Sequence, residues 1–154
     1  YRAIAELIEI GVDRASLEES RRQYNKLAEK IYRYKADLIK RTELLNDNTI
    51  ACVTVPQQEI SEFSPLYNPV ALIQPDMLQI ESVKLVIVFK TYRDGKITGS
   101  IRCNNTAPIG AKLALELGGG GHDYASGFKI TDGRPFNEVK SECIRIASDL
   151  LANI

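Results

Sequence analysis

Apolar residues recur with helical spacing along the first third of the chain. Residues 3–10 mix apolar and charged positions in a way typical of one or two helical turns, and Gly11 is a residue type that commonly follows a helix end. From Ser16 to Leu45 there is neither glycine nor proline, and Ser16 with Glu19 matches a capping box. The pattern therefore predicts a long amphipathic N-terminal helical arm, as one helix or as two with a break near Asn25.

The apolar positions of this arm follow a heptad spacing. They are Leu17, Tyr24, Ile31, Leu38 and Leu45. A heptad seam can pair two copies of a chain in a coiled coil, but this one barely meets the length that a coiled coil requires. Packing against the rest of the same chain is the favoured interpretation, and a homodimer stays open as the alternative.

After residue 46 the pattern changes to alternating strands and helices. Asn46-Asp47-Asn48 predicts a turn, and the proline-rich stretch 56–80 predicts short helices that begin at Asn68-Pro69 and Gln74-Pro75. Asp94-Gly95 predicts a hairpin. Strands are expected at 49–55, 83–92, 96–103 and 124–130, and helices at 108–117 and 135–152. The predicted fold class is α/β, a mixed β-sheet flanked by helices, with a domain edge near residue 46.

Composition and charge narrow the kinds of partner. Twenty basic residues balance twenty acidic ones, so a long surface that tracks duplex nucleic acid is not expected. No apolar run reaches the roughly 18 residues of a membrane span. Three widely spaced cysteines without a C-x-x-C pair indicate reduced thiols and a cytoplasmic location. The first residues lack both a leader pattern and an initiating methionine, which predicts a piece of a longer protein.

A run of four glycines, 118–121, is followed at once by His122, the only histidine of the chain. Glycines lose much backbone freedom on ordering, so such a run suggests a backbone that must approach another group closely. Successive backbone N–H groups can bind phosphate oxygens, and an imidazole at the rim adds a hydrogen bond. The alternative interpretation is a flexible turn between a helix and a strand.

Arg102 ends the predicted strand that leads toward this run. Ligand-contacting residues of α/β sheets tend to lie at strand ends, and the planar guanidinium suits a phosphate or a carboxylate. An exposed arginine without a ligand is the alternative. The fact that only one helix separates Ser100-Ile101-Arg102 from the glycine run favours a shared site.

The sequence lacks the residues that several other kinds of binding or catalytic site require. Neither a Walker loop nor a dinucleotide fingerprint is present, and a lone histidine excludes multi-histidine metal sites. A nucleophilic pair of Cys103 and His122 has no orienting signature. The residues alone predict a chain that binds, with no catalytic and no metal-ligating residue of its own.

The string Gly-Gly-Gly-Gly-His-Asp-Tyr-Ala-Ser-Gly-Phe at 118–128 resembles the GGGH-x-x-A-[AS]-G signature of the DHH-associated C-terminal domain. Gly-Ser-Ile-Arg-Cys-Asn at 99–104 matches the S-x-R-S/C element of that domain, and residues 7–13 resemble the end of the catalytic DHH domain. Ser126 stands where a second alanine is commoner. Among subfamilies, the spacing is most similar to bacterial enzymes that degrade very short oligoribonucleotides and dephosphorylate 3′-phosphoadenosine-5′-phosphate.

The resemblance implies a division of the chain and a role for each part. Residues 1–46 would be the end of a DHH domain with linker helices, and 47–154 a substrate-binding domain for short RNA or a nucleotide phosphate. The substrate-binding residues implied are Ser100, Arg102, Gly119, Gly120, Gly121 and His122. Manganese would belong to the N-terminal DHH domain, without which this chain would be inactive. The alternative is a nucleic-acid-binding module like the one appended to alanyl-tRNA synthetase.

Overall fold

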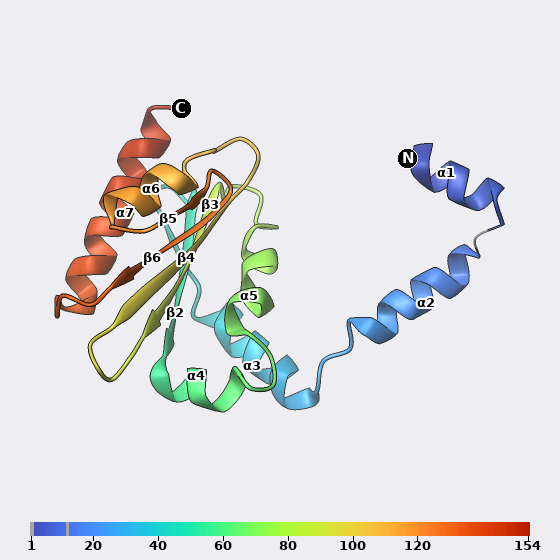
Figure 1. Cartoon of the computed structure of the whole chain (residues 1–154), viewed down its shortest axis with the longest axis horizontal. Helices are drawn as coiled ribbons and strands as arrows, with labels where there is room; N and C mark the ends of the chain where they lie inside the picture. The colour runs from blue at the N-terminus through green and yellow to red at the C-terminus, as the bar shows by residue number, and fades with distance from the viewer. Residues whose placement is uncertain (1, 12) are drawn as a thin grey trace.

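One six-stranded mixed sheet organises the molecule, and helices pack on both of its faces (Figure 1). The computed structural model describes residues 2–11 and 13–154. The strand order is β1-β2-β3-β4-β6-β5; β2 and β3 are parallel and all other neighbours are antiparallel. The strands are β1 (Glu43–Leu45), β2 (Ile50–Pro56), β3 (Leu85–Thr91), β4 (Ile97–Cys103), β5 (Gly120–His122) and β6 (Ala125–Ile130). The predicted α/β class is confirmed.

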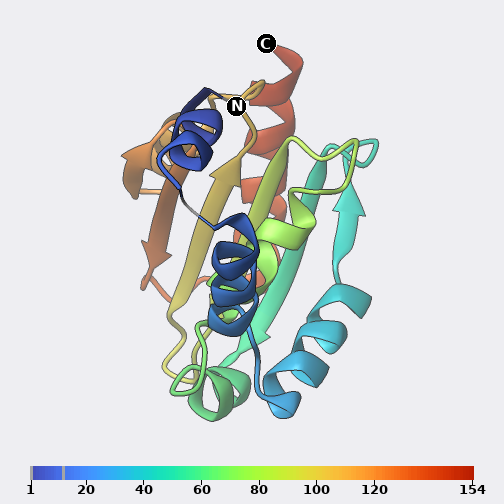
Figure 2. The same cartoon turned by 90° about the vertical axis from the view of Figure 1, so that its right-hand side faces the viewer.

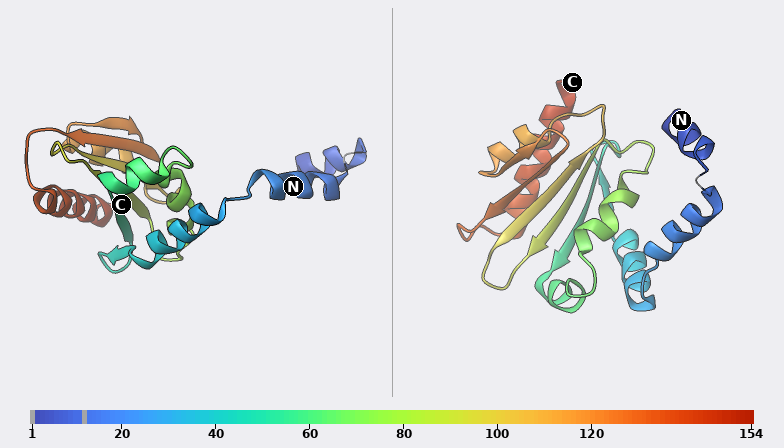
Figure 3. Two further views of the ribbon diagram at one scale, coloured as in Figure 1. Left: turned by 90° about the horizontal axis from the view of Figure 1, so that it is seen from below. Right: turned by 45° about the vertical axis from the view of Figure 1, so that its right-hand side comes forward.

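Helices form two layers around this sheet and an arm beside it. They are α1 (Arg2–Glu9), α2 (Arg14–Tyr24), α3 (Glu29–Lys40), α4 (Gln57–Phe63), α5 (Pro69–Met77), α6 (Gly110–Glu116) and α7 (Phe136–Ala152). Seen from below, α7 lies on one side of the sheet and α3 with α5 on the other (Figure 3). The arm of α1 and α2 extends away from this body (Figure 1).

Each face of the sheet has its own apolar core. On the α6 and α7 side, residues such as Ile87, Phe89 and Ile101 are fully buried against Leu113 and Val139. On the α3 and α5 side, the valines of β2 and β3 pack against Leu38 and Ile73. Because β3 is buried on both faces, its sequence is continuously apolar over Leu85–Phe89.

The helical arm is broken where the sequence allowed a break. Asn25 follows α2, and α3 begins at Glu29, so the two-helix alternative is correct. Asp13 rather than Ser16 caps α2: its carboxylate accepts from the Ala15 N–H at 2.9 Å and from the Ser16 hydroxyl at 2.6 Å. The helix therefore starts before the predicted capping box, because an aspartate three residues upstream of Ser16 satisfies the N–H of Ala15 in the first turn.

The heptad seam divides into a buried and an exposed half. Ile31 and Leu38 are buried in the core on the α3 side, so this half packs against the same chain as expected. Leu17 and Tyr24 in α2 are exposed. Both α3 and β1 belong to the packed body although they precede residue 46, and the assignment of residues 1–46 to a DHH domain and linker stays a prediction.

Two smaller differences have local causes. Residues 69–77 form one helix with Pro75 inside it, so a helix start at Gln74-Pro75 is wrong; Asn68 caps the helix by accepting from the Val70 N–H at 3.0 Å. The end of the predicted arm, residues 43–45, pairs with β2 as a strand instead of continuing the helix. Within the described part of the chain, no helix has both the length and the apolar character needed to cross a bilayer.

Candidate functional site

The half of the sheet formed by β4, β6 and β5 is open on the side where α3 and α5 cover β2 and β3 (Figure 2). Val86 and Val88 of β3 are fully buried on this side. Arg102 in β4 and His122 in β5 lie on the same side and are exposed. The α5 layer thus lies mainly over β3 and reaches β4 through Gln74, while Arg102 and His122 beyond it face solvent.

The strand register brings the predicted site residues together. Arg102 pairs with Ala125, and Ala125 pairs with His122, while Ser100 lies one pair further along β4. Directly paired residues point to the same face of a sheet. Adjacent strands lie about 4.8 Å apart, so the backbones of Arg102 and His122 are separated by about 10 Å across β6.

The glycine run is a tight packed segment in place of the loose turn of the alternative interpretation. Gly118 ends α6 with a φ of +71°, a conformation that favours glycine. A Cβ on Gly119 would lie 2.1 Å from the Gly127 carbonyl oxygen. Gly121 has a φ of +136°, and a Cβ there would lie 2.5 Å from the Ser126 Cα. These three glycines are required by the fold itself.

Gly120 differs from its neighbours. A Cβ at Gly120 would meet nothing within 4 Å, and the backbone there does not adopt a positive φ. Gly120 pairs with Gly127, which pairs with Ser100, so the empty space lies over the open face. The described structure contains no intramolecular reason for glycine at this position.

The turn that carries His122 is anchored to the start of α6. The Gly110 N–H donates to the Asp123 carbonyl at 2.8 Å, and the Cys103 N–H donates to the Tyr124 carbonyl at 3.1 Å. The hydroxyl of Ser126 donates to the Gly110 carbonyl at 2.7 Å. Ser126, where alanine is commoner in the signature, therefore adds a hydrogen bond that holds the β5–β6 hairpin against α6.

A buried glutamine supports β4 from the covered side. The Gln74 side chain, only 5% exposed, donates to the Ser100 carbonyl at 3.0 Å. The sequence analysis assigned Gln74 to a helix start and missed this role, because nothing local marks a contact between α5 and β4. The Arg102 guanidinium donates to the Ile101 carbonyl at 3.3 Å and, among the described residues, has no carboxylate partner.

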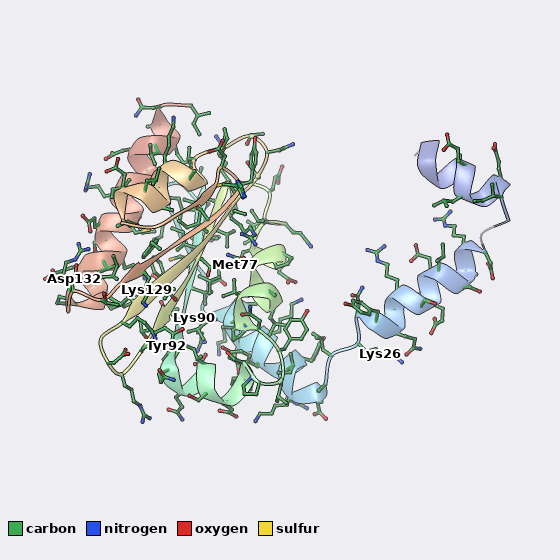
Figure 4. All side chains as sticks on the ribbon, in the orientation of Figure 1. Lys26, Met77, Lys90, Tyr92, Lys129 and Asp132 are labelled. Carbon is green, nitrogen blue, oxygen red and sulfur yellow. The ribbon has the colours of Figure 1, made fainter. Side chains whose placement is uncertain are left out.

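Two lysines on the same face also escaped the sequence analysis. Lys90 of β3 pairs with Thr98 of β4, and Thr98 pairs with Lys129 of β6. Desolvation by partial burial lowers the pKa of Lys90. Figure 4 shows Lys90 and Lys129 toward the end of the sheet where Asp132 lies. Alternation along β4 places Thr98 on the same face as Ser100 and Arg102. The sequence analysis could not place Lys90 and Lys129 beside Thr98, because that requires the register of β4 with β3 and β6.

The cysteines lie outside this site. All three are buried and unpaired, as expected for reduced thiols. Burial raises the pKa of Cys52 to about 11 and that of Cys143 to about 12. Cys103 packs in the core on the α6 side, whereas His122 is exposed on the opposite face, so the two cannot act as a nucleophilic pair. Over residues 2–11 and 13–154, the acidic residues, cysteines and His122 form no group of three or more suited to a metal ion.

The family model of the DHHA1 domain matches residues 69–153, a span that contains β4, the glycine run and His122. This chain belongs to the DHHA1 domain family. The resemblance that the sequence motifs indicated is thereby confirmed, and the matched span runs from α5 to α7.

Two solved structures share the DHHA1 fold of this chain. An exopolyphosphatase-related protein from Bacteroides fragilis is 24% identical with a TM-score of 0.75, over 97% of this chain and 43% of that one. A pGpG-specific phosphodiesterase from Vibrio cholerae is 15% identical with a TM-score of 0.52, over 80% of this chain and 41% of that one. The chain thus spans less than half the length of either protein. No curated protein sequence matches it.

Proposed function

We propose that this DHHA1 domain is the substrate-binding part of a DHH-family phosphoesterase that acts on nucleoside phosphates or short oligoribonucleotides. The observation that carries the proposal is Gly120. The other glycines of the run are needed for chain packing or a positive φ, whereas Gly120 leaves open space on β5 beside His122, on the face that carries Ser100. A side chain missing only over an open face suits close approach of a ligand.

The surrounding groups suit a phosphate. The Arg102 guanidinium offers a planar pair of donors without a competing carboxylate among the described residues, and Ser100 and His122 add polar groups on the same face. In this proposal Arg102 and His122 bind phosphoryl oxygens, and the flat backbone at Gly119–Gly121 lets the substrate lie against the sheet. The chain itself contributes binding and no catalytic group.

We further propose that catalysis belongs to an N-terminal DHH domain on the same polypeptide, whose manganese ions would activate water. The arm supports this arrangement, since α1 and α2 stand on the side of the sheet that carries the open face (Figure 2). The names of the two similar structures refer to polyphosphate and to pGpG, which fits a phosphoester or phosphoanhydride substrate. This chain with Mn²⁺ alone would then not hydrolyse a dinucleotide.

Titration of the chain with AMP and with the dinucleotide pApA tests the proposal. Replacement of Arg102 by alanine removes a charge-assisted contact of roughly 1.5–3 kcal/mol, so we expect affinity to fall by about 10²-fold. Arg145→Ala is the matched control, because Arg145 lies on α7 on the other side of the sheet and pairs with Asp149. Calorimetry measures both affinities, and urea unfolding checks that Arg102→Ala leaves stability unchanged.

Three outcomes would contradict the proposal. If the native chain and Arg102→Ala bind the nucleotide with equal affinity, the guanidinium does not contact the ligand. If the chain binds no nucleotide at all, the proposed substrate-binding function is wrong. Binding of a structured RNA without binding of AMP or pApA would favour the module of the alanyl-tRNA synthetase kind instead.

A further inference from the structure

A second row of polar groups runs along the same side of the sheet, parallel to the row of Arg102 and His122, from the end of the covered strand β3 to β4 and β6 of the open half. Lys90, Thr98 and Lys129 lie side by side on β3, β4 and β6 in direct register. Directly paired residues share a face, so the two lysines flank the Thr98 hydroxyl. With strands about 4.8 Å apart, the backbones of Lys90 and Lys129 are about 10 Å apart, and both four-carbon side chains can reach the space above Thr98.

Neither the Lys90 nor the Lys129 side chain has a hydrogen-bond or ion-pair partner among the residues that the structure describes. No carboxylate within 4.0 Å of Lys90 or Lys129 is found in the described part of the chain. Helix α4 lies beside the end of β2 and β3, and both of its glutamates are already paired: Glu59 with Arg41 and Glu62 with Lys30. The ammonium group of Lys96, just before β4, already lies 3.8 Å from the centre of the Tyr92 ring. Partial burial also disfavours the charged form of Lys90, as its lowered pKa indicates. A bound anion would therefore give Lys90 and Lys129 the charge partner that they lack among the described residues.

The floor between the two rows carries no bulky side chain on β4, β6 and β5. It consists of Ser100, Gly127 and Gly120. Thr98 lies four residues before Arg102 on β4, which at about 3.4 Å per residue separates the rows by about 14 Å. A single nucleotide is too short to place phosphates on both rows, whereas the sugar–phosphate backbone of a short oligonucleotide can.

We propose that Lys90, Thr98 and Lys129 form a second anion-binding row that holds a further phosphate of an oligonucleotide whose first phosphate lies at Arg102 and His122. This inference rests on the proposed function, since it assigns the chain length of the substrate at that same site. The row would make the domain prefer oligonucleotides over mononucleotides.

The test compares AMP with the trinucleotide pApApA on the native chain and on the double variant Lys90→Gln/Lys129→Gln. We expect the double variant to bind pApApA about tenfold more weakly and with less salt dependence, and to bind AMP as the native chain does. The matched control is Lys40→Gln/Lys112→Gln, which removes the same charge from α3 and α6. Neither control lysine lies on the sheet, and we expect both affinities to stay unchanged.

A trinucleotide with uncharged methylphosphonate linkages identifies the group that the lysines contact. If the lysines bind a phosphate, the native chain binds the methylphosphonate ligand more weakly than pApApA. The double variant, which already lacks the lysines, then binds both ligands equally, as a double-mutant cycle requires. Equal losses in both proteins would overturn the inference. Inorganic polyphosphate carries the same anionic chemistry, so it is titrated in parallel. If the double variant weakens the binding of polyphosphate but not that of pApApA, the assignment to an oligonucleotide is overturned.

The remaining outcomes separate this inference from the proposed function. Loss of AMP binding in Arg102→Ala, with no effect of the lysine pair on pApApA, would overturn only the second row. Equal weakening of AMP and pApApA by the lysine pair would also overturn it. A native chain that binds neither ligand would overturn both.

Discussion

The two halves of one sheet face carry opposite chemistry. Over β2 and β3, Val53, Val86 and Val88 are fully buried beneath α3 and α5. Over β4, β6 and β5 the same face carries Ser100, Arg102 and His122; the arm helices stand in front of it in Figure 2 but lie away from the sheet in Figure 1. The sheet is continuous across this border, so the helices alone decide which half is core and which half is available to a ligand.

Deletion of a core side chain from the covered half has the largest expected effect. Ile73 of α5 is 0% exposed, and Ile73→Ala should lower the free energy of unfolding by about 2–5 kcal/mol, because it removes buried methyl groups and leaves a cavity. Urea unfolding followed by circular dichroism measures this. Ser100→Ala in the open half is the counterpart and should change stability by no more than about 0.5 kcal/mol. A similar loss in both variants would contradict the division into covered and open halves.

The glycine run provides a second comparison within three residues. Gly119→Ala places a methyl group against the Gly127 carbonyl and should destabilise the domain by about 1–3 kcal/mol. Gly120→Val points into open space, so it should leave the unfolding midpoint nearly unchanged and abolish nucleotide binding. Thermal unfolding and nucleotide titration together check the pair. Retained binding in Gly120→Val would show that the substrate does not approach this strand.

A smaller, pH-dependent effect is expected in the covered half. Glu59 accepts from Tyr34 at 2.9 Å and pairs with Arg41 through both of its oxygens. Burial acts to raise the pKa of Glu59, but the hydrogen bonds from Arg41 and Tyr34 outweigh it, and the pKa is lowered from 4.5. This carboxylate stabilises the fold fully above about pH 4.5, and the contribution disappears as pH falls through the lowered pKa.

Glu59→Gln isolates that contribution. We expect the native chain to lose more stability than Glu59→Gln between about pH 6 and about pH 3, since only the native chain has this carboxylate to protonate. Urea unfolding at each pH gives the two curves. Parallel curves would mean that the ion pair with Arg41 does not stabilise the folded state.

The smallest effect is expected in the arm. Leu17 lies on α2 and is 54% exposed, so Leu17→Ser should change the free energy of unfolding by less than about 0.5 kcal/mol. Its heptad counterpart in α3, Ile31, is 2% exposed. Ile31→Ser should therefore lower the free energy of unfolding strongly, because it buries a hydroxyl group in the apolar core. Sedimentation velocity adds a second readout: a fall in mass in Leu17→Ser would show that the exposed half of the seam pairs two chains.

Sequence patterns predicted most elements because their determinants are local. The Asp94-Gly95 hairpin, the turn at Asn46–Asn48 with its positive φ values, and the strands β2, β3, β4 and β6 follow from residue type and alternation. Predictions were wrong where a competing local group lay nearby. Asp13 replaced Ser16 as the cap of α2, and Asn68 set a helix that continues through Pro75.

Residues of the site were predicted unevenly for a similar reason. Ser100, Arg102 and His122 stand in motifs, so they could be singled out before the fold was known. Gln74, Lys90 and Lys129 are ordinary residues in their own segments. Their importance comes from contacts and strand pairs with residues up to 31 positions away, as between Thr98 and Lys129, and no local pattern encodes these.

By itself the sequence determined the α/β class, the position of most strands and helices, the family, and a glycine-rich segment beside one histidine. These follow from short-range rules of propensity, alternation and motif. Only the tertiary structure decided that α5 packs on β3 and reaches β4 through Gln74, that Gly120 alone among the four glycines has neither a positive φ nor a close neighbour for a Cβ, and that two lysines share a row with Thr98. Such facts depend on how distant strands pair and on which faces the helices cover, and both are settled by packing across the whole domain.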